Sequence, residues 1–205
     1  MTGDLIVARD GMAVGVGASL PEKLGWHCEW DVTRWDEEAT AWAQKRLGIH
    51  RVEADDFRAL KVRPYSETHV DGNLLTTAGI GRLVTLANAG TGNLVASTTA
   101  RVGAGNGGGT AAIGDTDLSA AAGSANRWFQ TCTVTTPSNV LTFAATFGTA
   151  DGNFAWTEFG IDIGTATVSS GNTVNAVLLN HKTSIAQGTK ASGQTWTATA
   201  TITIS

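Results

Sequence analysis

The chain has 205 residues, a hydrophobic content of 42% and a formal net charge of −4. This size suits one large domain, or one domain with a sizeable extension. The acidic balance argues against a nucleic-acid partner, because nucleic-acid-binding domains carry basic surfaces. No apolar run approaches the roughly 18 residues that a membrane span needs, so no membrane partner is expected either.

The N-terminal residues and the cysteines indicate where the chain is made. The opening stretch MTGDLIVARDG lacks a basic segment followed by an apolar one, so we expect no secretory signal. Two cysteines, Cys28 and Cys132, are too few for a disulfide scaffold. Synthesis in a reducing cytoplasm is therefore expected, and a single bridge between the two stays open.

Charge is spread unevenly along the chain. Residues 1–82 hold 10 basic and 13 acidic side chains, whereas residues 83–205 hold 4 and 5. Such a shift in composition predicts two differently built regions. We expect an N-terminal docking region with a hairpin and a helix over residues 1–70, and a helix plus a β-sandwich domain over residues 71–205.

The N-terminal region contains one clear helix signal. Asp10-Gly11 between apolar runs predicts a hairpin, and WHCEWDV predicts a strand. A helix is expected over about residues 34–47, capped by Thr33 and ended by Gly48. Its helical spacing predicts one buried stripe, made of Trp35, Ala39, Trp42, Ala43 and Leu47.

Two further segments precede the β-rich part. The stretch DDFRALKVRPY predicts a short helical turn or a strand that ends before Pro64. A second helix is predicted from Leu74 to Asn88, with Asn73 as its cap. Gly79 and Gly81 weaken that helix, which suggests close packing against a neighbouring backbone. Its predicted buried stripe consists of Leu75, Ile80, Leu83 and Leu86.

Beyond this helix the hydrophobic period changes to two. LTFAATF and the terminal TWTATATITIS alternate between apolar and polar residues, and RWFQTCTVT and NAVLLNHKTS also read as strands. Short strands with Gly, Ser, Thr and Asn turns favour an antiparallel sandwich. The predicted fold is mainly β (α+β): an antiparallel β-sandwich preceded by a smaller α/β region with one or two helices.

One expected strand changes its apolar phase. In NFAWTEFGIDIG the apolar face switches sides at Glu158 and Phe159. Either a β-bulge restores the inward face, or Glu158 points inward and needs a cationic or donor partner. Arg127, Lys182 and Lys190 are the candidate cations, and we predict a structural pair between Glu158 and Arg127, or a bulge.

The stretch RVGAGNGGGTAAIGDTDL matches G-x-G-x-x-G at residues 103–108. A dinucleotide loop needs a following helix and an acidic residue about 20 positions on, and neither is present in the pattern. We therefore predict a loop whose turn is closed by Asp115 or Asp117, with Leu118 packing inward. The bare backbone of Gly107, Gly108 and Gly109 makes this loop a candidate contact with a neighbouring subunit.

The remaining motifs do not assemble a reaction centre. No G-x-S-x-G elbow occurs. The four histidines lie far apart, and the adjacent side chains of His27 and Cys28 rarely chelate one ion together. Catalytic residues, cofactors and metals are accordingly predicted as none, and the protein is not expected to be an enzyme. Trp26 and Trp30 are not assigned to the core by hydrophobic periodicity, so each is either a core residue or a surface anchor for a protein or a glycan.

The order of the C-terminal motifs resembles a recurrent family of tailed-bacteriophage virion proteins over about residues 70–205. The stretches that carry this resemblance are DGNLLTTAGIGRLVTL, ARVGAGNGGGTAAIGDTDLSAAAG, LTFAATFGTADGNFAWTEFGID and LLNHKTSIAQGTKASGQTWTATATITIS. His181 departs from the family, which often has arginine at that position. The resemblance implies a structural part of the virion, found in particles and made in the host cytoplasm.

Two functions are compatible with these features. The first is a head decoration or a neck or tail accessory subunit that binds other virion proteins as a homo-oligomer such as a trimer. The second is a host-surface or glycan-binding module of a tail fibre, for which spare tryptophans on a β-sandwich would supply sugar-stacking platforms.

Overall fold

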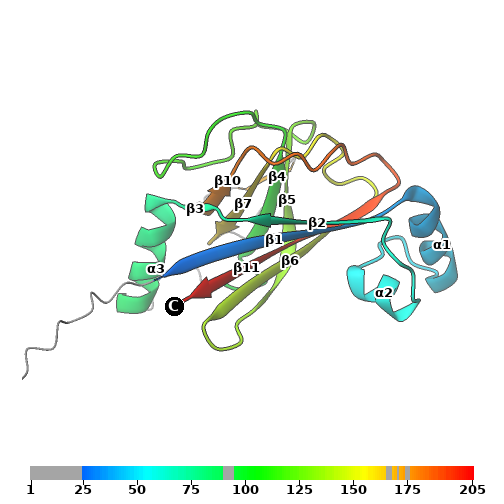
Figure 1. The fold of residues 1–205 in the computed structure, drawn as a ribbon, viewed down its shortest axis with the longest axis horizontal. Helices are drawn as coiled ribbons and strands as arrows, with labels where there is room; N and C mark the ends of the chain where they lie inside the picture. Colours follow the sequence, from blue (N-terminus) through cyan, green and yellow to red (C-terminus); the bar gives the residue numbers. More distant parts are fainter. Residues whose placement is uncertain (1–24, 90–94, 165–167, 170, 174–175) are drawn as a thin grey trace, which may run out of the picture.

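The computed structural model describes residues 25–89, 95–164, 168–169, 171–173 and 176–205. The hairpin predicted at Asp10-Gly11 lies outside these residues. Within them, nine strands form one antiparallel sheet in the order β2-β1-β11-β6-β5-β4-β7-β10-β3, and β8 pairs with β9 apart from it (Figure 1). The strands of the large sheet are β1 (Trp26–Trp35), β2 (Ser66–Asp71), β3 (Leu74–Leu75), β4 (Ala100–Gly105), β5 (Arg127–Thr135), β6 (Val140–Phe147), β7 (Glu158–Ile163), β10 (Val177–Lys182) and β11 (Thr195–Ile204), and the small pair is β8 (Val168–Ser169) with β9 (Asn172–Thr173).

The sheet curls so that its two halves face each other. Strand β5 belongs to both halves, because its residues 127–131 pair with β4 and its residues 132–135 pair with β6. The apolar core fills the space between the halves: Trp30 of β1 stacks on Phe159 of β7 with ring centroids 4.8 Å apart. The mainly-β prediction is confirmed, and its two layers are halves of one continuous curled sheet.

Strand β11 shows why alternation predicted this part of the fold. Trp196, Ala198, Ala200 and Ile202 are buried in the core, while the intervening threonines face outward. All ten residues of β1 pair with β11, from Trp26 opposite Ile204 to Trp35 opposite Thr195. The boundary predicted between residues 70 and 71 falls inside β2, and β1 lies within the sheet, so residues 25–70 are not a separate domain.

Strand β7 is buried on both faces, which explains its change of apolar phase. Phe154 and Trp156 precede the strand, and β7 starts at Glu158. Phe159 and Ile161 face the core, whereas the opposite face is covered by the connection from β4 to β5: a Cβ at Gly160 would lie 2.9 Å from Leu118 Cδ2. The bulge predicted at residue 158 is absent, because β4 and β7 pair there in regular register.

Helix α1 (Glu37–Leu47) is shorter than predicted. Asp36 caps it, its carboxylate accepting from Ala39 N at 2.8 Å, and Gly48 ends it in the left-handed conformation with φ 69°. Thr33 is not the cap, because β1 runs on to Trp35. The predicted buried stripe is wrong at Trp42 and Leu47, which are 49% and 40% exposed. The small satellite core under this helix is already filled by Trp35, Ala43, Val52 and Phe57.

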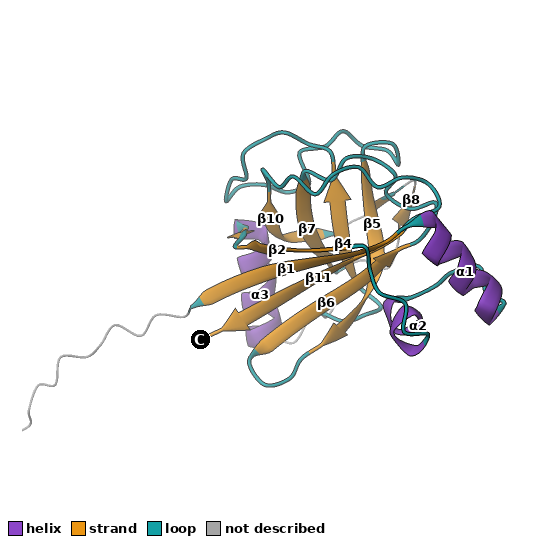
Figure 2. Cartoon of the chain, turned by 45° about the vertical axis from the view of Figure 1, so that its right-hand side comes forward, coloured by secondary structure: helices purple, strands orange, loops and turns teal. Residues whose placement is uncertain are grey.

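Two more helices complete the described chain. Helix α2 (Ala54–Ala59) confirms the predicted helical turn, and its Phe57 ring stacks on Trp35 at 4.3 Å. Helix α3 (Thr77–Ala89) starts later than predicted, because residues 74–75 pair with β10 as β3. None of the described helices has the length and apolarity to cross a membrane. Figure 2 shows α1 and α2 at one end of the sheet and α3 at the other.

Helix α3 packs closely on a bulge in β10. The Thr76 hydroxyl caps the helix by accepting from Gly79 N at 2.9 Å. A Cβ at Gly79 would lie 2.4 Å from the carbonyl oxygen of Leu179, where the register with β7 shifts. Close packing is therefore confirmed at Gly79, whereas Gly81 faces open space.

Candidate functional site

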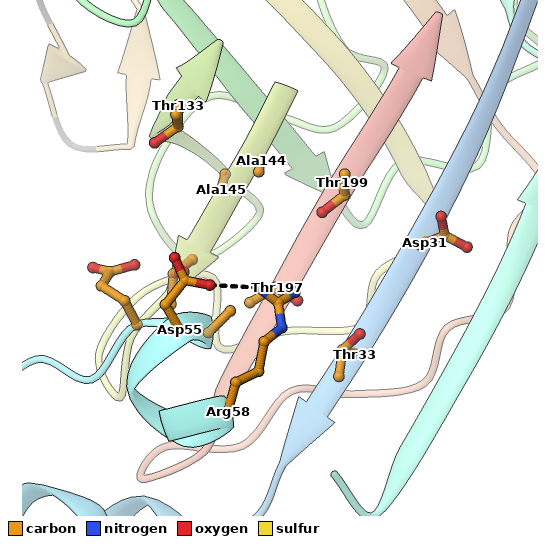
Figure 3. Close-up of a pocket in the computed structure, with 12 residues that line it drawn as sticks. Asp31, Thr33, Asp55, Arg58, Thr133, Ala144, Ala145, Thr197 and Thr199 are labelled. Atoms are coloured by element: carbon orange, nitrogen blue, oxygen red, sulfur yellow. Dashed lines mark hydrogen bonds and ion pairs between the residues drawn. The ribbon is translucent and has the colours of Figure 1, made fainter. Parts of the chain in front are cut away.

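A polar groove lies on the outward face of the sheet beside α2 (Figure 3). Its volume is about 520 Å³. Three carboxylates and one cation line it, and the cation, Arg58, is paired with Asp55 one turn earlier in α2. Hydroxyl groups from neighbouring strands form its floor. The lining residues are Asp31, Thr33, Glu53, Ala54, Asp55, Arg58, Thr133, Ala144, Ala145, Thr146, Thr197 and Thr199.

A second polar site is buried under the glycine-rich connection between β4 and β5. His181 of β10 lies between two carboxylates: its Nε2 is 2.9 Å from Glu158 Oε2 and its Nδ1 is 2.6 Å from Asp115 Oδ2. Glu158 and His181 are fully buried, at 0% and 1% exposure. The partner of Glu158 is therefore His181, and the predicted pair with Arg127 is wrong.

Three backbone amides complete the environment of Glu158. Its carboxylate accepts from Ser119 N at 2.8 Å, Ala120 N at 2.7 Å and Gly107 N at 3.2 Å. A Cβ at Gly107 or Gly105 would lie within 2.5 Å of Glu158 Oε1. The glycines of the G-x-G-x-x-G match therefore make room for a buried carboxylate of the same chain. The first three residues of the match, 103–105, belong to strand β4.

The charges of this cluster stabilise one another. Burial would raise the pKa of Glu158, but hydrogen bonds from His181, Ser119 and Ala120 outweigh it and lower the pKa. Burial would likewise lower the pKa of His181, yet its bonds to Glu158 and Asp115 raise the pKa. Asp115 also accepts from Ala112 N at 2.8 Å. The charged forms of all three side chains are favoured. The cluster therefore holds the connection between β4 and β5 against strands β7 and β10.

The three predicted cationic partners of Glu158 bind elsewhere. Arg127 Nη1 pairs with Asp117 Oδ2 at 2.7 Å. Lys190 Nζ donates to the carbonyl oxygen of Gly148 at 2.7 Å, and burial lowers its pKa to about 8. Lys182 Nζ donates to the backbone carbonyl of Asp71 at 2.7 Å. The prediction that Asp115 or Asp117 closes a turn is confirmed for Asp115, whose Oδ2 accepts from Ala112 N at 2.8 Å. Leu118 packs inward as predicted, at 5% exposure, and its backbone N–H donates to Asp117 Oδ1.

Asp162 is a further buried carboxylate. Among the described contacts it has no basic side chain at hydrogen-bond distance. Asp162 accepts a hydrogen bond from the Thr173 hydroxyl. Burial raises the pKa of Asp162 to about 7. Its charged form is therefore disfavoured near neutral pH.

The two candidate tryptophan anchors differ in position. Trp30 is fully buried against Phe159, so it cannot be a surface anchor. Trp26 is half-buried, and its indole N–H donates to Asn73 Oδ1 at 3.0 Å. In the glycine loop, Gly108 faces open space, whereas a Cβ at Gly109 would lie 2.9 Å from Ser119 Oγ.

Large apolar side chains are exposed at both ends of the sheet. We define the α1 surface as Trp42, Leu47 and Ile49, which are 49%, 40% and 37% exposed. We define the α3 surface as Ile80, Val84 and Ile113, which are 41%, 61% and 56% exposed. Ile113 belongs with α3 because its carbonyl oxygen accepts from Thr77 N at 2.8 Å. Sequence periodicity did not predict that Trp42 is exposed. Periodicity shows which residues share one face of a helix, but not how many of them pack against a neighbouring element.

Side chains that can ligate a metal ion also lie close together at positions that sequence spacing did not predict. On the outward face of β1 and β2, donor atoms of His27, Glu29 and Asp71 lie within 4.8 Å of one another. Cys28 points the other way and is buried. Both cysteines are free thiols, and burial raises the pKa of each to about 12, so the bridge left open by the sequence does not form.

Comparison with protein-family models, with curated proteins and with solved structures finds no match to this chain.

Proposed function

We propose that this chain is a structural subunit of a tailed-bacteriophage virion, a head decoration or a neck or tail accessory protein that acts through protein–protein contacts. The motif order over residues 70–205 supports this function through its resemblance to virion proteins. The observation that carries the proposal is the pair of exposed apolar surfaces next to α1 and α3. These two helices lie at opposite ends of one sheet (Figure 1).

The position of these surfaces suits a bridging subunit. Strand β1 is ten residues long and connects the two ends of the sheet. Its first residue, Trp26, is hydrogen-bonded to Asn73, which precedes β3 and α3, and its last residue, Trp35, precedes α1. At about 3.3 Å per residue the strand spans roughly 30 Å. Exposed apolar side chains that gather in one place support an interaction site, and tryptophan is enriched among the residues that dominate interfaces. The sheet would thus hold two partners at a defined separation.

The charge around each surface indicates its partner. The α1 surface is surrounded by charged residues, with Glu37 and Glu38 in the first turn and Lys45 and Arg46 in the last. Charged residues around an apolar surface restrict which partner it accepts, so we assign this surface to a different virion protein. Helix α3 has no acidic residue in its first turn and no basic residue in its last, and the adjacent loop is glycine-rich. This weakly charged end would contact a second copy of the chain in a homo-oligomer.

Particles of the phage that encodes this chain provide the test. Mass spectrometry should detect the chain in purified virions, and added Trp42→Glu protein should fail to attach to particles that lack it. Ala41→Glu, an exposed position on the same helix turn, is the matched control and should attach normally. The chain's absence from virions, or normal attachment of Trp42→Glu, would overturn the proposal.

The α3 surface has a separate test in solution. Val84→Glu should lower the oligomer mass measured by light scattering, whereas Thr85→Glu, the neighbouring exposed position, should leave it unchanged. A mass that is the same for both variants and for the parent would contradict self-association through α3.

The groove of Figure 3 favours one alternative, a glycan-binding module of a tail fibre. Its threonine hydroxyls and carboxylates are suited to hydrogen-bond a polyhydroxylated ligand. The groove, rather than Trp30, would then be the binding site. In a glycan array, Thr199→Val should lose binding while Trp42→Glu keeps it. If the unmodified protein binds no glycan, the alternative fails.

A further inference from the structure

We infer that the outward face of β1 and β2 binds one divalent transition-metal ion of the zinc class through His27, Glu29 and Asp71. This site is independent of the proposed virion function.

The antiparallel register brings the three donors together. His27 and Glu29 are two residues apart on β1, so they share one face, and Asp71 of β2 lies directly opposite Glu29. His27 Nε2 is 2.9 Å from Glu29 Oε1, and all three donor atoms lie within 4.8 Å of one another. Ligands around a tetrahedral ion bonded at about 2.1 Å are roughly 3.4 Å apart, so rotations of exposed side chains suffice to close the site.

Three carboxylates lie close together here, and the nearby Lys182 ammonium donates to the backbone carbonyl oxygen of Asp71 rather than to any of them. Glu29, Asp31 and Asp71 lie on the same outward face of two adjacent strands. The ion pairs found among the described residues connect these three carboxylates to histidines and to no lysine or arginine side chain. A divalent cation between Glu29 and Asp71 would compensate the repulsion between their carboxylates.

A second histidine supports the site from outside it. His69 Nε2 lies 3.1 Å from Asp71 Oδ1, and its Nδ1 lies 2.8 Å from Asp31 Oδ1. These bonds hold the Asp71 carboxylate on the side of β2 that faces Glu29. Outer contacts of this kind orient the ligands of metal sites.

The donor set selects the class of ion. Imidazole nitrogen with carboxylate oxygen suits Zn²⁺ and its first-row neighbours, whereas Ca²⁺ and Mg²⁺ prefer oxygen alone. Cys28 is not a ligand, because alternation turns it into the core, where it is 1% exposed. Three protein ligands leave a position for water. Since the ligands come from both strands, the ion would tie the edge strand β2 to β1.

Calorimetric titration of the chelator-treated full chain with Zn²⁺ tests the site. We expect one ion per chain, with affinity lowered by about 10–100-fold or more in His27→Ala and in Asp71→Asn. His50→Ala removes an exposed histidine outside the cluster and should bind like the parent. Because the altered side chains are on the surface, circular dichroism should show the same fold for every variant.

Two further measurements detect the bound ion and its effect on β2. Co²⁺ in place of Zn²⁺ should give the visible absorption of a four-coordinate site in the parent and in His50→Ala, and lose it in His27→Ala. Zn²⁺ should also slow hydrogen exchange of the β2 amides. Lack of saturable binding, or equal affinity in the parent, His27→Ala and Asp71→Asn, would overturn the assignment.

Discussion

Alanine at Gly107 should destabilise the protein, whereas alanine at the adjacent Gly108 should not. A Cβ at Gly107 would lie 2.5 Å from both Glu158 Oε1 and the backbone nitrogen of Ala120. Real Cβ contacts shorter than 3.0 Å essentially do not occur, so the loop must move away from the carboxylate. A Cβ at Gly108 meets no heavy atom within 4 Å.

The size of the effect follows from the bonds that move. Glu158 Oε1 accepts from Gly107 N at 3.2 Å and from Ala120 N at 2.7 Å. Hydrogen bonds to a charged group contribute about 1.5–3 kcal/mol each, so disturbing this pair should cost about 2–4 kcal/mol of unfolding free energy. For a domain of this size that corresponds to a fall in Tm of roughly 6–12 °C. Gly108→Ala should stay within about 0.5 kcal/mol of the parent.

Urea unfolding and calorimetry of the two variants, at concentrations where the parent is monomeric, measure this difference. Equal stabilities for Gly107→Ala and Gly108→Ala would refute the assigned role of Gly107 as the space for the carboxylate. The comparison also separates folding from assembly. A role of the loop at a subunit contact is best tested with Gly108→Ala, because Gly107→Ala disturbs the monomer itself.

Three more outcomes are expected. The lowered pKa of Glu158 gives stability that is present above pH 4.5 and lost as the pH falls through that pKa, while the raised pKa of His181 gives stability that is complete below pH 6.5 and lost as the pH rises through it. Urea midpoints measured across pH should fall on both the acid and the alkaline side, and His181→Gln should remove the fall on the alkaline side. An unchanged alkaline fall in this variant would contradict the ion pair between His181 and Glu158. Asp162→Asn should stabilise the protein at pH 8, on the order of 3 kcal/mol, because ionisation through the raised pKa of about 7 destabilises the parent there; the gain should vanish near pH 4, and a loss at pH 8 would show that the charge is needed. Trp30→Ala should cost about 3–5 kcal/mol in denaturant unfolding because the side chain is fully buried, whereas the half-exposed Trp42→Ala should cost under about 1 kcal/mol; similar costs would contradict the assigned burial.

Local patterns in the sequence determined the kinds of element and several of their ends. Alternation in TWTATATITIS predicted β11, because one face of that strand is buried and the other faces outward. The positive φ of Gly48 and the carboxylate turn before Leu118 also follow from residues close together in the chain. Such features depend on backbone sterics and neighbouring side chains, which a short stretch of sequence already contains.

Only the tertiary structure decided which of these elements meet. Glu158 and His181 are 23 residues apart, and Asp115 is 66 residues from His181, so no local spacing marks them as one cluster. Trp30 is buried because β7 packs across β1, while Trp42 is exposed because its satellite core is already full. Burial and charge pairing depend on strand register and on what covers each face, and these are properties of the whole curled sheet rather than of any one segment.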